Sequence, residues 1–127
     1  MMKSVPTILI LMLVLVLKSN ATICPDPYTP PLKNGDIPLP WVLNPLSSHR
    51  PQEDPDTRFI RVNILVANIG RGVVCTYHNS VGYYSILWNV GVKLPAPQEN
   101  YWRAAALGGF ECDQSLSECV FYPAAAS

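Results

Sequence analysis

The run of residues 59–77 constrains the fold most, because apolar positions alternate within it and the chain then reverses. β-branched side chains occupy every second position of its first half: Ile60, Val62, Ile64 and Val66. The intervening positions are Arg61, Asn63, Leu65 and Ala67. A period of two places the β-branched set on one buried face of a β-strand. Glycines on either side of Arg71 permit a tight turn, after which a second strand carries Cys75 into the core beside Val73 and Tyr77.

Residues 22–55 form a proline-rich segment that cannot be a helix or a central strand. Nine of the 13 prolines in the chain fall within it, and proline lacks the backbone donor that both structures need. Several positions are nevertheless apolar: Ile37, Leu39, Trp41, Val42, Leu43 and Leu46. We therefore predict a strap over residues 22–57 that packs on the sheet, with residues 47–56 as an exposed polar loop. A proline-rich ligand for a partner protein is the alternative.

A β core is expected over residues 58–122. Residues 83–89 alternate and predict a third strand, with Tyr84, Ile86 and Trp88 on one face. Between the end of the second strand and this third strand, residues 78–82 form a turn cluster.

The C-terminal part of the core is less regular in sequence. Residues 101–107 fit a helix or a strand, and we favour the strand. Residues 110–112 and 119–122 predict a hairpin, and residues 123–127 should fray. The fold class is therefore mainly β: a small antiparallel sheet or sandwich with a proline-rich N-terminal strap and two disulfides.

The N-terminus has the pattern of a secretory signal peptide over residues 1–21. Lys3 precedes an apolar stretch, and Ser19 and Ala21 are the small residues of a cleavage site. The stretch is shorter than the roughly 20 residues that span a bilayer, which disfavours an uncleaved membrane anchor. After cleavage, no stable membrane insertion is expected. A lipoprotein signal at Cys24 is disfavoured because Ile23 is large. We expect residues 22–127 to form a single exported domain, periplasmic or secreted.

The cysteines lie in the expected mature chain, and an even number in an exported protein predicts two disulfides. They are Cys24, Cys75, Cys112 and Cys119. Three connectivities are possible, and we favour Cys112–Cys119 with Cys24–Cys75 because the first pair is closest in sequence. A zinc site is the alternative, but no Cys-x-x-Cys knuckle is present. Neither a metal nor a cofactor is expected.

Charge and reactive residues indicate few chemistries. Without the signal peptide, seven basic and nine acidic residues remain, with no basic run to bind nucleic acid. His78 lies near Cys75 and Ser80, but no nucleophile-elbow motif surrounds that serine. The carboxylate pairs Glu53/Asp54 and Glu111/Asp113 fit a solvated surface better than a glycosidase site. We therefore expect no catalytic residue.

A binding surface is the more promising expectation. Its candidate residues are Tyr83, Tyr84, Trp88, Trp102 and Leu116. Aromatic rings gathered on an open sheet face would form a platform for a protein or carbohydrate partner, although core packing is the alternative. If the face of Tyr84 and Trp88 is core, Tyr83 points outward. The disulfide-closed loop 113–118 would instead present Leu116 as the specificity residue of a protease inhibitor.

Short motifs add a resemblance that spans most of the mature chain. They are Cys24-Pro25, Gly35, Trp41, residues 72–77, residues 109–112 and residues 119–121. In these the chain resembles a family of small exported two-disulfide domains of unknown function from Gram-negative bacteria. The resemblance implies a bacterial exported context and brings no substrate or catalytic residue. We expect a non-catalytic binding or interaction module, with a protease inhibitor and a small periplasmic enzyme as alternatives.

Overall fold

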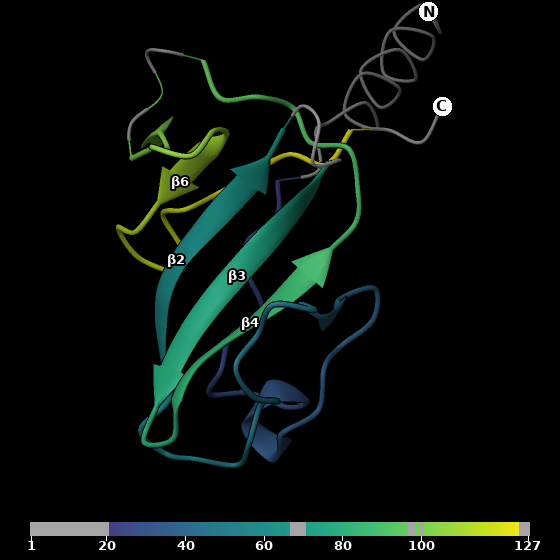
Figure 1. Ribbon diagram of the computed structural model, residues 1–127, viewed down its shortest axis with the longest axis vertical. Coiled ribbons are helices and arrows are strands. Elements are labelled where there is room, and N and C mark those ends of the chain that lie inside the picture. Colours follow the sequence, from purple (N-terminus) through teal and green to yellow (C-terminus); the bar gives the residue numbers. More distant parts are fainter. Residues whose placement is uncertain (1–20, 67–70, 97–98, 100, 125–127) are drawn as a thin grey trace, which may run out of the picture.

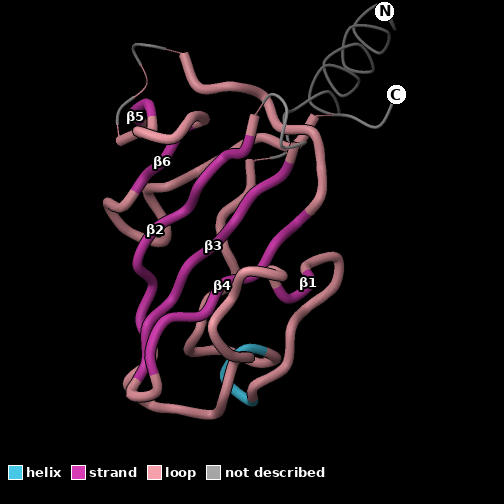
Figure 2. The backbone as a smooth tube through the Cα atoms, viewed as in Figure 1, coloured by secondary structure: helices cyan, strands magenta, loops and turns pink. Residues whose placement is uncertain are grey.

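A single antiparallel sheet dominates the structure, a computed structural model that describes residues 21–66, 71–96, 99 and 101–124. The elements found there are the 3-10 helix η1 (Leu32–Asn34) and the strands β1 (Val42–Leu43), β2 (Arg58–Leu65), β3 (Gly72–Asn79), β4 (Gly82–Trp88), β5 (Arg103–Ala104) and β6 (Phe110–Cys112). The six strands lie in the order β1-β4-β3-β2-β6-β5 (Figures 1 and 2). The predicted fold class is confirmed. No helix in these ranges is long and apolar enough to cross a membrane.

Strands β2 and β3 form the predicted hairpin. Val62 pairs with Cys75 and Ile64 with Val73, and all four side chains are buried. The prediction for Ile60 is wrong, because a β-bulge between Phe59 and Arg61 shifts the register. The extra residue moves Phe59 onto the core face, where its ring lies 6.2 Å from that of Tyr77. Gly70 of the predicted turn lies outside the described residues, and Gly72 already belongs to β3.

Strand β4 is the predicted third strand, with Tyr84 and Ile86 buried. The turn before it is shorter than predicted, because His78 and Asn79 belong to β3. Only Ser80 and Val81 separate the paired residues Asn79 and Gly82. The Asn79 side-chain oxygen accepts the backbone N–H groups of Val81 at 3.0 Å and Gly82 at 3.2 Å. This cap satisfies the donors of the turn.

The first part of the proline-rich segment packs on one face of the sheet as predicted, and its residues Val42 and Leu43 then join the sheet as the edge strand β1 beside β4. In Figure 1 the purple start of the segment runs behind the sheet, and the blue part continues along the β4 edge. Leu32 and Trp41 are buried in the core, and the Cys24–Cys75 disulfide ties the strap to β3. The prediction that residues 47–56 are exposed holds only in part, because Pro51 is buried. The Asp54 carboxylate also accepts the backbone N–H and the hydroxyl of Ser80.

The C-terminal part differs most from the prediction. In residues 101–107 only β5 is a strand, and it pairs with β6. The hairpin of residues 110–112 with residues 119–122 is wrong, because β6 already has β2 and β5 on its two edges. Phe121 instead exchanges two backbone hydrogen bonds of 2.9 Å with Thr22.

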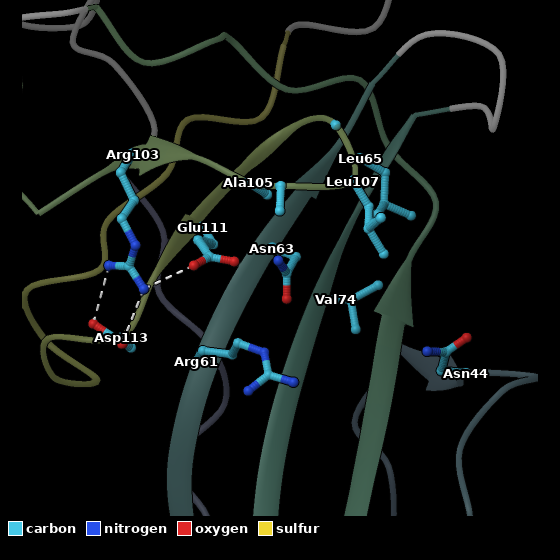
Figure 3. A pocket seen from close by; sticks show the side chains of 12 residues that line it. Asn44, Arg61, Asn63, Leu65, Val74, Arg103, Ala105, Leu107, Glu111 and Asp113 are labelled. Atoms are coloured by element: carbon cyan, nitrogen blue, oxygen red, sulfur yellow. Dashed lines mark hydrogen bonds and ion pairs between the residues drawn. The ribbon is translucent and has the colours of Figure 1, made fainter.

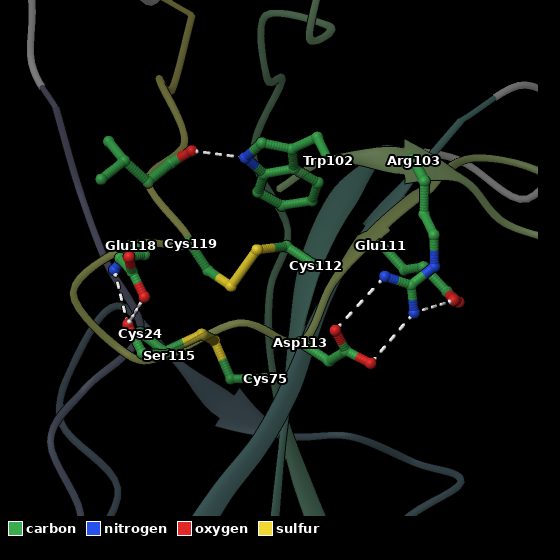
Figure 4. Close-up of a disulfide and its surroundings, with 11 residues drawn as sticks. Cys24, Cys75, Trp102, Arg103, Glu111, Cys112, Asp113, Ser115, Glu118 and Cys119 are labelled. Carbon is green, nitrogen blue, oxygen red and sulfur yellow. Dashed lines mark hydrogen bonds and ion pairs between the residues drawn. A yellow bond between two sulfur atoms is a disulfide. The ribbon is translucent and has the colours of Figure 1, made fainter. Parts of the chain in front are cut away.

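The predictions for the C-terminal tail and for the second disulfide have different outcomes. The expectation that residues 123–127 fray is wrong up to Ala124, whose N–H donates to the Gly91 carbonyl at 2.7 Å. Residues 125–127 lie outside the described residues. The predicted Cys112–Cys119 disulfide is confirmed (Figure 4), and together with Cys24–Cys75 it accounts for every cysteine of the chain.

Candidate functional site

The face of the sheet opposite the buried Leu32 and Trp41 carries a groove. Its cavity volume is about 500 Å³. The residues that line it are Asn44, Arg61, Asn63, Leu65, Val74, Arg103, Ala105, Ala106, Leu107, Gly108, Glu111 and Asp113 (Figure 3). They come from β2, β3, β5 and β6, from the turn after β5, from Asp113 directly after β6 and from the segment after β1. We call this cavity the sheet-face groove.

The floor follows from the alternation of β2. Arg61, Asn63 and Leu65 point away from the core because Val62 and Ile64 point into it. Val74 faces the same way, since it pairs with Asn63 across β2 and β3. The positions of the alternating run that do not enter the core therefore form this open face.

One wall is the turn between β5 and β6, which rests directly on β2. Gly109 has φ of 76°, and a Cβ atom there would lie 2.2 Å from the Ile64 carbonyl oxygen. Only glycine permits this approach. The Ala105 N–H donates to the Gly109 carbonyl at 3.0 Å, which closes the turn. Leu107 stands at its tip with 96% of its surface exposed.

An ion-pair cluster forms the corner of the groove on β5 and β6. The Arg103 guanidinium lies 2.7 Å from Glu111 Oε2 and 3.0 Å from Asp113 Oδ2, with a further bond of 3.3 Å to Asp113 Oδ1 (Figure 4). The hydrogen bond from Arg103 holds the pKa of Asp113 below its usual value, and the same bond raises the pKa of Arg103. Arg103 thus serves two carboxylates at once and is not free to bind a ligand anion.

Arg61 and Asn63 contrast with this cluster. Within the described ranges, the Arg61 guanidinium has no ion-pair partner. The Asn63 side-chain amide makes no hydrogen bond to another described residue, whereas Asn44 on the opposite side donates to Ser85 Oγ at 2.9 Å. Figure 3 shows Arg61 extending from β2 toward β3, and its charge contributes to lowering the pKa of Asp113 without forming an ion pair. The floor therefore offers one cation and one amide to a ligand.

The aromatic residues predicted to form a platform do not come together on an open face. Tyr84 is buried and its ring stacks on that of Tyr77 at 5.1 Å. Trp88 packs against Trp41 with ring centroids 5.7 Å apart. Tyr83 is 53% exposed, beside His78. These rings serve the core rather than a shared surface, apart from Tyr83.

The loop 113–118 also packs inward at the predicted specificity residue. Leu116 is half-buried against the core, and Trp102 donates from Nε1 to the Val120 carbonyl at 2.9 Å. The Ser115 hydroxyl lies 2.7 Å from the Glu118 carboxylate and accepts the Glu118 N–H at 3.1 Å (Figure 4). The loop is thus fixed by its own side chains, and Leu116 does not protrude.

Residues considered for catalysis are dispersed. His78 lies in β3 and contacts the Tyr83 ring at 4.5 Å. His49 lies in the loop after β1, against Tyr84. Neither lines the groove, and no group of three potential metal ligands occurs among the described residues. Asp54 caps the β3–β4 turn, and the hydrogen bond from Ser80 lowers its pKa.

The groove residues were absent from the predicted binding surface. A signal for part of them exists in the sequence, because Arg61 and Asn63 occupy the polar positions of the alternating run. No sequence signal places Arg103 between Glu111 and Asp113, since that contact requires β5 and β6 to pair. Searches against protein-family models, curated proteins and solved structures find no match. The family resemblance therefore stays a prediction.

Proposed function

We propose that the protein is an exported, non-catalytic binding module that receives its ligand in the sheet-face groove. The observation that carries the proposal is the pair of unpartnered polar side chains, Arg61 and Asn63, on the floor of a cavity of about 500 Å³. A groove of this size with a few convergent polar groups among apolar ones is typical of a ligand site. The cavity lies on the face of the sheet opposite Leu32 and Trp41, and the strap reaches it at Asn44.

Export is supported by the two disulfides and by the signal pattern of residues 1–21. Disulfides persist in oxidising compartments, so the periplasm or the outside of the cell suits this chain. Residues 1–20 lie outside the described residues.

The alternatives receive less support from the site. A small enzyme would need a nucleophile, a base or a free acid in the groove, and both groove carboxylates are bound by Arg103. A protease inhibitor would need an exposed specificity residue on a protruding loop, and Leu116 packs against the core. A binding module requires neither feature.

The test is a variant that fills the groove. Asn63→Trp places a large side chain on the floor, whereas Leu46→Trp adds the same ring at a position that is 90% exposed and outside the groove. On peptide and glycan arrays, we expect ligands that bind both the wild-type protein and Leu46→Trp. Asn63→Trp should not bind these ligands. Melting temperature is measured alongside, because the comparison requires both variants to fold. Ligands that Asn63→Trp binds as well as wild type would refute the groove as the binding site.

A further inference from the structure

The charges of the sheet-face groove are divided between its two sides. Glu111 and Asp113 lie on the β6 side and share Arg103 as their cation. The Arg61 guanidinium extends to the β3 side (Figure 3) and has no ion-pair partner among the described residues. An unpaired guanidinium binds a carboxylate with two parallel hydrogen bonds, so the β3 side is suited to an anionic group.

The same charges limit the ligand to one negative group. Four ionised side chains line the groove, two basic and two acidic, so its formal charge is zero. One carboxylate complements Arg61. A second negative charge would lie near Glu111 and Asp113, where the cluster carries an excess of one negative charge, and would be repelled. Polyanions such as nucleic acid or phosphorylated chains are therefore unsuited to this site.

Asn63 adds a second recognition group between the charged and apolar parts. Its side-chain amide carries a donor and an acceptor, neither of them bonded to another described residue. A peptide group presents the matching acceptor and donor. Because Asn63 lies between Arg61 and Leu65 on β2, a ligand bound to Arg61 passes over this amide.

The far end of the groove is apolar. Leu65 is half-buried there with the exposed Leu107 beside it, and the half-buried Val74 adjoins them next to Asn63 (Figure 3). Arg61 and Leu65 are four residues apart on one strand, which is about 13 Å. An extended chain bridges that distance with a carboxylate at one end and an apolar side chain about four residues away. The lining contains no aromatic ring, which favours a peptide over a sugar.

We propose that the groove binds a short extended peptide segment with one acidic residue, whose carboxylate pairs with Arg61, and an apolar residue that packs on Leu65, Val74 and Leu107. The segment's backbone bonds to the Asn63 amide. This inference rests on the proposed function, because it names the ligand class of the same groove.

Fluorescent pentapeptides with blocked ends test the inference, because their only carboxylate is a side chain. The probe carries leucine first and aspartate fifth, and the matched control peptide carries asparagine instead of aspartate. Binding is measured by fluorescence polarisation with full-length mature protein. We expect the aspartate peptide to bind at least about tenfold more tightly, as a bidentate pair with arginine implies. Raising the salt from about 0.05 M to about 0.5 M should reduce this preference.

Arg61→Gln should abolish the preference for aspartate. Arg58→Gln is the control, because Arg58 is an exposed cation on the same strand that does not line the groove, and it should keep the preference. Both variants must retain the wild-type melting temperature.

Equal binding of the two peptides, or a preference that survives Arg61→Gln, would overturn the inference. Absence of measurable binding to either peptide would overturn it too. The proposed function fails separately, because it depends on whether Asn63→Trp removes array ligands of any class. Glycans that bind wild type and not Asn63→Trp would uphold the groove and exclude the acidic peptide.

Discussion

Removing the Trp41 side chain tests how the strap is attached. Trp41 is 5% exposed, and its ring lies 5.7 Å from that of Trp88 on β4 and 6.3 Å from that of Phe121. It is therefore the point where the strap, the sheet and the C-terminal segment meet. We expect Trp41→Ala to loosen all three together.

The expected loss follows from the buried area. A tryptophan buries roughly 200 Å², and at about 25 cal/mol per Å² this contributes close to 5 kcal/mol as an upper estimate. Measured losses for Phe or Trp to Ala in cores are about 3–5 kcal/mol, so we expect about 4 kcal/mol. With a urea slope of about 1.3 kcal/mol/M, the midpoint should fall by about 3 M.

Urea unfolding followed by far-ultraviolet circular dichroism measures the change without relying on the deleted fluorophore. Leu39→Ala is the matched control, because Leu39 belongs to the same strap and is 89% exposed. It should change stability by less than about 0.5 kcal/mol. If Trp41→Ala does not fold, Trp41→Phe should show an intermediate loss. A loss for Trp41→Ala no larger than that of Leu39→Ala would refute the packing of the strap on the sheet.

Three further predictions concern the staples, the faces of β4 and the buried tyrosines. Replacing Cys24 and Cys75 together by alanine should cost about 4 kcal/mol, and replacing Cys112 and Cys119 about 2 kcal/mol, because they close loops of 51 and 7 residues; reversed magnitudes in urea unfolding would contradict this entropic account. Trp88→Ala should destabilise by about 3 kcal/mol, whereas the exposed Tyr83→Ala should leave the melting temperature nearly unchanged; the opposite order would invert the faces of β4. Burial raises the pKa of Tyr84 to about 12 and that of Tyr77 well above its usual 10. The burial of both tyrosines therefore stabilises the fold fully below pH 10 and less as the pH rises toward 12. In an alkaline titration followed by absorbance, these two tyrosines should ionise last, together with unfolding. Ionisation of all six tyrosines of the chain in protein that is still folded would exclude the buried placement.

Much of the central sheet could be predicted from the local sequence. The alternation of β2 and β4 needs only a period of two, and it correctly assigns Val62, Ile64 and Tyr84 to the core. Nearness in sequence favours the Cys112–Cys119 disulfide, which leaves Cys24 for Cys75. The bulge that exchanges Ile60 for Phe59 escapes this reasoning, because it depends on how β3 fits beside β2.

The candidate site is only half readable in the sequence. The polar positions of β2 identify Arg61 and Asn63 as residues of an open face. The wall of the groove depends on Gly109, whose approach to the Ile64 carbonyl exists only when β6 lies beside β2. The reach of Arg103 to both Glu111 and Asp113 likewise depends on β5 pairing with β6.

The sequence by itself determined the mainly β class, the strap and the disulfides. The alternation of apolar residues, the proline content and the cysteine spacing that indicate them are local properties of the chain. The tertiary structure alone decided where residues 119–122 go. Both edges of β6 are taken, so Phe121 pairs with Thr22 and packs edge-on against Trp41. This placement depends on which apolar surfaces, far apart in sequence, can be buried together. Their burial stabilises the fold only when all of these surfaces are in place.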